Sequence, residues 1–156
     1  MSVIERQQRP RWNLPPFVDA TLPVEVWHDP VTERVGAPVG SAYTERFWLP
    51  VLGPTTTWLL RHLDARLEES PAGILLHVGE AARALGVATT SDNAGPLARA
   101  LNRCVIFGLA QPVGSVVAVR RWVPPLPGKY AGQLPEGLWV AHGRWLNECG
   151  GAARGG

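Results

Sequence analysis

The chain has 156 residues, of which 46% are hydrophobic and 18% charged, with a formal net charge of +2. This composition indicates one globular domain with some residues left over for arms. The start of the chain, "MSVIERQQRPRW", has no apolar segment of the signal-peptide type, and no run of 18 apolar residues predicts a membrane span. Cys104 and Cys149 lack a CxxC spacing, so we expect reduced thiols in a cytoplasmic protein.

The first 43 residues are rich in proline, which excludes a long helix, and we expect an N-terminal arm over residues 1–43. Within it, "VEVWHDPVTERVG" alternates briefly around Asp29-Pro30, which favours a marginal hairpin or an arm lying on a neighbour. The next stretch, "SAYTERFWLP", is predicted to form a short helix that ends at Pro50.

The segment "GPTTTWLLRHLDARLEES" predicts the first long helix. Gly53 is its expected N-cap and Pro54 takes the first position, where a missing N–H costs nothing. Its apolar stripe, at helical spacing, consists of Thr56, Leu59, Leu60, Leu63 and Leu67. "GILLHV" then predicts a short strand, and "GEAARALG" a short helix that ends at a left-handed Gly86.

A second helix of this pair is predicted over residues 94–107, after a turn at 87–93. If Asn93 is the N-cap, Pro96 falls at the third position and avoids a clash with a preceding carbonyl. Leu97, Leu101, Cys104 and Val105 form the apolar stripe of this helix. Arg99, Asn102 and Arg103 lie off the stripe and are therefore predicted to be exposed.

Beyond Gly108 the periodicity changes from helical to alternating. "LAQPV", a Gly114-Ser115 turn and "VVAVRRWV" predict a β-hairpin that prolines end. "PEGLWVAHGRWLNE" predicts a last helix that places Leu138, Ala141 and Trp145 on one face. We thus expect an arm (1–43), a domain (44–128), a C-terminal helix packed on it (129–149) and a flexible tail (150–156).

The order helix, strand, helix, turn, helix and hairpin is that of an α+β, mainly α, winged helix-turn-helix domain. "VGEAARALGV…PLARALNRCVIFGLAQ" resembles the helix-turn-helix and wing entry of bacterial winged helix-turn-helix DNA-binding proteins. "FWLPVLGPTTTWLLRHL" is similar to the segment that opens the N-terminal winged helix of DnaD/DnaB-type primosomal proteins. The resemblance covers residues 47–125. The bias to Arg, 14 against one Lys, fits an actinobacterial or actinophage chain.

The positive charge is concentrated in residues 91–130, which hold five cations against Asp92 alone. An Arg pairs with guanine and an Asn with adenine in the major groove, while wing cations neutralise phosphates. We therefore predict a non-enzymatic double-stranded DNA-binding protein, a transcriptional regulator that reads the major groove with the helix at 94–107. The expected DNA-binding residues are Thr90, Ser91, Asn93, Arg99, Asn102, Arg103, Arg120, Arg121 and Lys129. The alternative for Arg99 and Arg103 is a merely solvated helix face.

The tryptophans support a rival hypothesis. Trp12, Trp27, Trp48 and Trp58 crowd the N-terminal third, and a proline-rich arm cannot build a core of its own. The chain would then be a winged-helix protein-interaction or dimerisation module, a replication- or phage-associated adaptor whose arm wraps a partner. Either hypothesis allows a homodimer that uses the arm and the helix of Trp139 and Trp145.

No catalytic, metal or cofactor site is predicted. The histidines His28, His62, His77 and His142 are scattered without ligand spacing, and no phosphate-binding loop pattern occurs. Ser, Cys and acidic residues form no coherent nucleophile–base set, so we expect neither an enzyme nor a small-molecule ligand.

Overall fold

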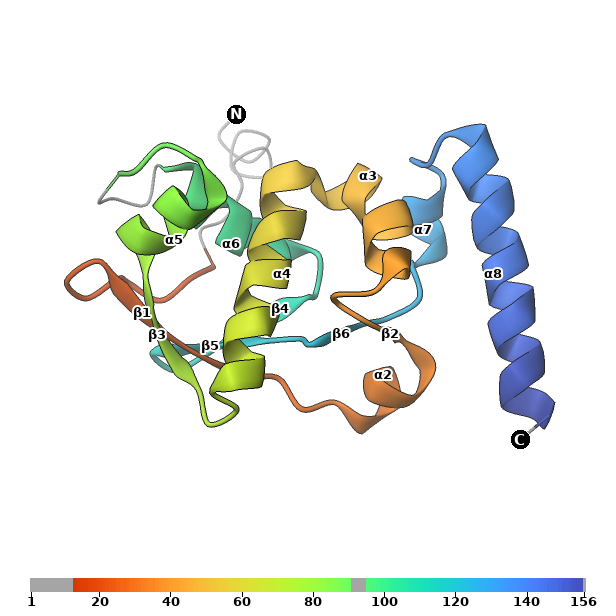
Figure 1. The fold of residues 1–156 in the computed structure, drawn as a ribbon, viewed down its shortest axis with the longest axis horizontal. Helices are drawn as coiled ribbons and strands as arrows, with labels where there is room; N and C mark the ends of the chain where they lie inside the picture. Colours follow the sequence, from red (N-terminus) through yellow and green to blue (C-terminus); the bar gives the residue numbers. More distant parts are fainter. Residues whose placement is uncertain (1–12, 91–94, 156) are drawn as a thin grey trace, which may run out of the picture.

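The computed structural model describes residues 13–90 and 95–155, with side chains as far as residue 149, and shows an α+β fold (Figure 1). In chain order its elements are β1 (Thr21–Val26), α2 (Pro30–Val35), β2 (Ala37–Pro38), the π-helical turn η1 (Thr44–Trp48), α3 (Leu49–Leu52), α4 (Pro54–Glu69), β3 (Ile74–His77), α5 (Val78–Leu85), α6 (Pro96–Ile106), β4 (Ala110–Val113), β5 (Val116–Val119), β6 (Trp122–Val123), α7 (Gly128–Ala131) and α8 (Glu136–Gly155).

The main sheet has the strand order β3-β1-β5-β4. The predicted hairpin is confirmed: β4 and β5 are antiparallel, and Gly114 at the turn has a φ of 63° that suits glycine. The expectation for the N-terminal segment was wrong. Instead of a hairpin or an arm on a neighbour, residues 21–26 form an inner strand, antiparallel to β3 and parallel to β5. Leu22 and Val24 of this strand are completely buried.

The Asp29-Pro30 pair begins a helix. The Asp29 carboxylate accepts hydrogen bonds from the Val31 and Thr32 N–H groups, and Pro30 takes the first position of α2. The chain then enters β2, which pairs antiparallel with β6 in a separate two-stranded sheet. A carboxylate cap followed by proline thus starts a helix at the place where a turn was expected.

Helix α4 lies across the main sheet (Figure 1) and begins as predicted, with Gly53 as N-cap and Pro54 as first residue. Its apolar stripe is buried as predicted, from Thr56 to Leu67. The stripe packs into a core shared with β1, β3, α5 and α6. Upstream, the prediction that Pro50 ends a helix was wrong, because Pro50 sits at the second position of α3.

Helices α5 and α6 confirm the predicted pair, with one correction. α5 ends at Gly86, whose φ of 70° is left-handed as expected. α6 starts later than predicted, with Gly95 as its N-cap and Pro96 as its first residue. At this first position the missing N–H of the proline costs no hydrogen bond. The proposed cap Asn93 lies outside the described residues. On the predicted stripe, Leu97, Leu101 and Cys104 are buried, and burial raises the pKa of the Cys104 thiol to about 12.

Helix α8 lies at the side of the molecule, away from the main sheet, and extends to Gly155 through the expected tail (Figure 1). The predicted face of Leu138, Ala141 and Trp145 does pack against the core. Tyr43 joins α8 to the rest of the fold: its hydroxyl accepts a hydrogen bond from the Leu126 N–H (2.7 Å) and lies 2.8 Å from His142 Nε2. Among the described helices, none is long and apolar enough to cross a membrane.

Candidate nucleic-acid interface

Only a narrow strip of α6 is open to solvent. Arg99, Arg103 and Ile106 are exposed, whereas most other residues of the helix are buried. Asn102, predicted to read adenine, is only 6% exposed, and its side-chain oxygen accepts a hydrogen bond from the Asn13 N–H (2.9 Å). The prediction of an exposed Asn102 was therefore wrong. The helical wheel could not reveal it, because the residue that covers this side of α6 lies far away in sequence.

Arg103 is exposed but anchored. Its Nε donates to the Leu52 carbonyl and its Nη2 to the Val51 carbonyl, both at 3.1 Å. These carbonyls end α3, and a cation at a helix C-terminus is favourable. A guanidinium has five N–H donors, so these two hydrogen bonds orient the group and leave further N–H groups able to donate to a ligand. The backbone turn at Gly53, with a φ of 83°, brings the end of α3 and the start of α4 to this one side chain.

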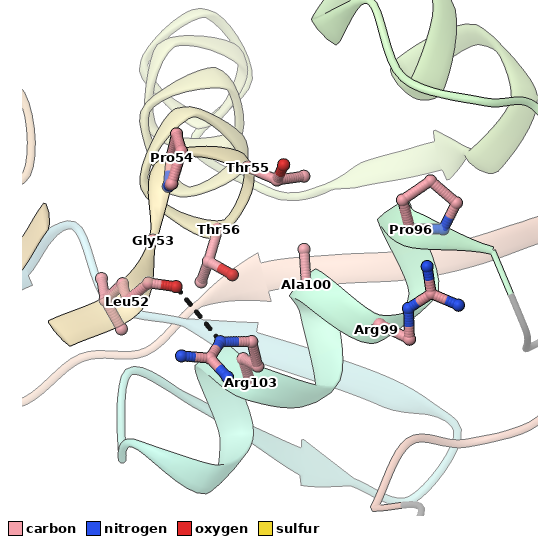
Figure 2. A pocket seen from close by; sticks show the side chains of 9 residues that line it. All are labelled: Leu52, Gly53, Pro54, Thr55, Thr56, Pro96, Arg99, Ala100 and Arg103. Atoms are coloured by element: carbon pink, nitrogen blue, oxygen red, sulfur yellow. Dashed lines mark hydrogen bonds between the residues drawn. The ribbon is translucent and has the colours of Figure 1, made fainter. Parts of the chain in front are cut away.

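A cleft of about 250 Å³ lies between the start of α4 and the outer strip of α6 (Figure 2). Arg99 and Arg103 line it from α6, and none of the described residues that line it is acidic. The residues around it are Leu52, Gly53, Pro54, Thr55, Thr56, Pro96, Arg99, Ala100 and Arg103. A surface of this kind, with two cations beside a helix N-terminus, favours anions.

A chain of cations and aromatic rings continues from the cleft toward α7. The Arg103 guanidinium lies 5.3 Å from the centre of the Phe107 ring, and the Phe107 and Tyr130 rings are 5.1 Å apart. The Lys129 ammonium in turn lies 4.9 Å from the Tyr130 ring. We call Arg99, Arg103, Phe107, Tyr130 and Lys129 the α6–α7 basic strip. Sequence reasoning named its three cations and missed its two rings, although each ring lies one or four residues from a cation.

The two predicted wing cations are used inside the fold. Arg120 donates to Asp29 Oδ2 and to the Gly108 carbonyl, each at 2.8 Å, and lies 3.6 Å above the centre of the Trp27 ring. Its side chain is only 12% exposed. Arg121 is paired with the Asp64 carboxylate at 2.7 Å. Both were predicted to be exposed, and this part of the expectation was wrong because the N-cap residue of α2 and an acidic residue of α4 face the base of the hairpin. Their contact with phosphates stays a prediction.

The remaining predicted residues lie near the start of α6. Thr90 is exposed in the turn that precedes this helix, whereas Ser91 and Asn93 lie outside the described residues. Of the tryptophans expected in an interface, Trp48 is buried in the core and Trp27 is covered by Arg120. Trp58 and Trp139 are 55% and 57% exposed, and Trp12 is again outside the described residues.

Comparison with protein-family models, with curated proteins and with solved structures finds no match to this chain. The described residues also contain no group of three His, Cys, Asp or Glu side chains placed to hold a metal ion. The features that point to a function are therefore the α6–α7 basic strip and the cleft beside it.

Proposed function

We propose that this chain is a non-enzymatic double-stranded DNA-binding protein, a transcriptional regulator that approaches DNA with α6. The observation that carries the proposal is the α6–α7 basic strip: Arg103 and Lys129 lie against the contacting rings of Phe107 and Tyr130, and Arg99 lines the cleft at the start of α4 together with Arg103. Arg120 and Arg121, by contrast, are engaged in ion pairs within the fold. Among the described residues, Arg103 and Lys129 form no ion pair with a carboxylate, and cations of this kind are what the phosphate backbone requires.

A winged helix-turn-helix arrangement is part of the proposal. It is supported by the order α4, β3, α5, α6 and the hairpin β4–β5. In this proposal α6 is the recognition helix and the hairpin is the wing. The strand β1 lies between β3 and the hairpin, so the wing is held by the N-terminal segment as well as by its own turn.

The distribution of cations assigns different tasks to the residues of this surface. The hairpin tip, Val113–Val116, carries no cation. The proposed phosphate contacts are therefore made by Lys129 and Arg103 and not by the tip of the wing. Arg99, exposed in the first half of α6, remains the candidate for reading guanine. With Asn102 buried, binding is expected to be dominated by the backbone and only modestly selective in sequence.

The experiment that tests this proposal is the salt dependence of duplex binding, measured by fluorescence anisotropy. Replacing Arg103 and Lys129 together by Gln should flatten the slope of log K against log salt by about two units, since each phosphate contact contributes about 0.9. The matched control replaces Arg34 and Arg144, which are exposed cations of α2 and α8, and changes the net charge equally. An equal effect of both pairs, or no binding by the parent at low salt, would refute the proposal.

One observation favours the rival function of a protein-interaction or homodimerisation module. On α8, Trp139, Val140 and Leu146 are 57%, 42% and 42% exposed and lie beside a groove that α8 forms with α7. In this alternative the interface is formed by α8 rather than by the N-terminal tryptophans. Binding through such a surface should barely respond to salt. Light scattering should then show a dimer that Trp139→Lys converts to a monomer.

A further inference from the structure

The hydroxyl of Thr56 makes no hydrogen bond to the described part of the fold. The residue is only 2% exposed, no described residue forms a hydrogen bond with its hydroxyl, and the oxygen is not among the fully buried polar atoms, so it reaches the solvent. The neighbouring Thr57 hydroxyl differs, since it donates to the Gly53 carbonyl at 2.8 Å. Figure 2 shows the Thr56 hydroxyl pointing into the space between α4 and α6, where Thr56 lines the cleft. A hydroxyl that has no partner within the fold and faces this cleft is available to hydrogen-bond a ligand there.

The backbone at the start of α4 also has hydrogen-bond donors without a partner among the described residues. Pro54 has no N–H, the Thr57 N–H bonds to the Gly53 carbonyl, and no side chain caps the helix. The N–H groups of Thr55 and Thr56 therefore have no partner among the described residues. Because α4 runs for 16 residues, its dipole adds partial positive charge at this end. Both threonines line the cleft, so two backbone donors and one hydroxyl belong to residues at its wall.

Arg103 supplies a full charge to the same cleft. It is held in place by the Val51 and Leu52 carbonyls, which would otherwise present partial negative charge here. The same guanidinium begins the cation–aromatic chain that leads to Lys129. Whatever binds in the cleft is therefore in contact with the α6–α7 basic strip.

We propose that this cleft binds a phosphate group, and that this group is one phosphodiester of the DNA backbone. The Thr55 and Thr56 N–H groups and the Thr56 hydroxyl would donate to the phosphate oxygens, and Arg103 would balance the charge. The second part of the inference rests on the proposed DNA-binding function, and the first part does not. A phosphate fixed at the start of α4 would set the position of α6 along the duplex.

The first experiment follows the amide signals of the ¹⁵N-labelled chain during titration with inorganic phosphate at constant ionic strength. We expect saturable shifts at Thr55 and Thr56. Thr56→Val should weaken phosphate binding about tenfold, as the loss of a hydrogen bond to a charged group predicts. Thr56→Val keeps the β-branched shape and removes only an unpaired hydroxyl. The control Thr89→Val, an exposed threonine outside the cleft, should bind as the parent does.

The second experiment compares duplex binding in chloride and in phosphate at equal ionic strength. Binding by the parent should be weaker in phosphate, and Thr56→Val should abolish the difference between the two salts. Amide shifts without this competition would overturn the assignment to the DNA backbone and leave a site for free phosphate. DNA binding without amide shifts would refute the phosphate site in the cleft but would leave the proposed DNA-binding function standing. Amide shifts in a chain that binds no DNA would uphold the phosphate site and refute the DNA-binding function.

Discussion

Arg120 is held by four contacts at once: an ion pair with Asp29, hydrogen bonds to the Thr32 hydroxyl and the Gly108 carbonyl, and the face of the Trp27 ring. These partners belong to two separate stretches of the chain. A cation with so many internal contacts stabilises the fold and has few N–H groups left to donate to a ligand. The same reasoning applies, more weakly, to Arg121, which bridges the hairpin to α4.

We therefore predict that Arg120→Met lowers the free energy of unfolding by about 1–2 kcal/mol, because a partly buried charge pair and a cation–π contact are lost. Urea denaturation measures this change. Arg34→Met, at an exposed cation of α2, is the control and should change stability by less than about 0.5 kcal/mol. If Arg120→Met instead left stability unchanged and flattened the salt slope of DNA binding, Arg120 would be a phosphate contact after all.

Asp29 provides a pH-dependent prediction. Hydrogen bonds from Arg120 and Thr32 lower the pKa of the Asp29 carboxyl from 3.8 to about 2. A lowered pKa in the folded state means that the carboxylate stabilises the fold above pH 3.8, and that this contribution is lost as the pH falls toward 2. The urea midpoint of the parent should thus fall between pH 4 and 2 more steeply than that of Asp29→Asn. Parallel curves for the two proteins would contradict the ion pair.

At the scale of elements, α8 is attached through a buried polar cluster. The Tyr43 hydroxyl accepts from the Leu126 N–H, which leaves its own proton available to His142 Nε2; a neutral imidazole protonated at Nδ1 accepts it. The Tyr43 and Trp145 rings lie against each other, tilted by 32°, with centroids 4.1 Å apart. Burial lowers the pKa of His142 below 6.5 and raises that of Tyr43 to about 12. Protonation of His142 would break the hydrogen bond and loosen α8.

Acidification should consequently weaken the attachment of α8. The unfolded chain binds the His142 proton more readily than the folded chain, so the stabilisation is complete above pH 6.5 and declines as the pH falls below it. Hydrogen exchange at α8 amides should be faster at pH 5 than at pH 7.5 after correction for intrinsic rates. His142→Gln should show the smaller difference. Because the pKa of His62 on α4 is also lowered, global stability alone would not be diagnostic.

The elements that could be predicted from sequence are those with local signals. Gly53-Pro54 and the leucine stripe define α4, Gly86 ends α5, and Gly114 marks the hairpin. The elements that could not be predicted depend on remote partners. Nothing in "TLPVEV" reveals that β1 pairs with both β3 and β5, and the burial of Asn102 depends on Asn13. The same holds for the candidate site: its cations were predicted from sequence, whereas the aromatic rings beside them, Phe107 and Tyr130, were not.

At the scale of the whole molecule, β1 makes the N-terminal segment part of the core. Leu22 and Val24 are fully buried between elements that come later in the chain. We predict that a chain shortened to residues 44–128 lacks cooperative unfolding at 25 °C, because β3 and β5 lose their common partner. A chain that starts at residue 13 is the control and should unfold cooperatively. Circular dichroism during thermal unfolding distinguishes them, and a stable shortened chain would show that β1 is dispensable.

The parallel pairing of β1 with β5 also constrains the timing of folding. Val24 must meet Val117, so most of the chain has to be synthesised before this ladder can close. Contacts between such distant residues slow folding, and domains dominated by them fold in milliseconds to seconds. During synthesis β1 can pair first with β3 alone, which leaves its other edge open until the hairpin emerges. An open edge of this kind pairs readily with other chains, so the growing polypeptide is most prone to aggregation just before its hairpin leaves the ribosome.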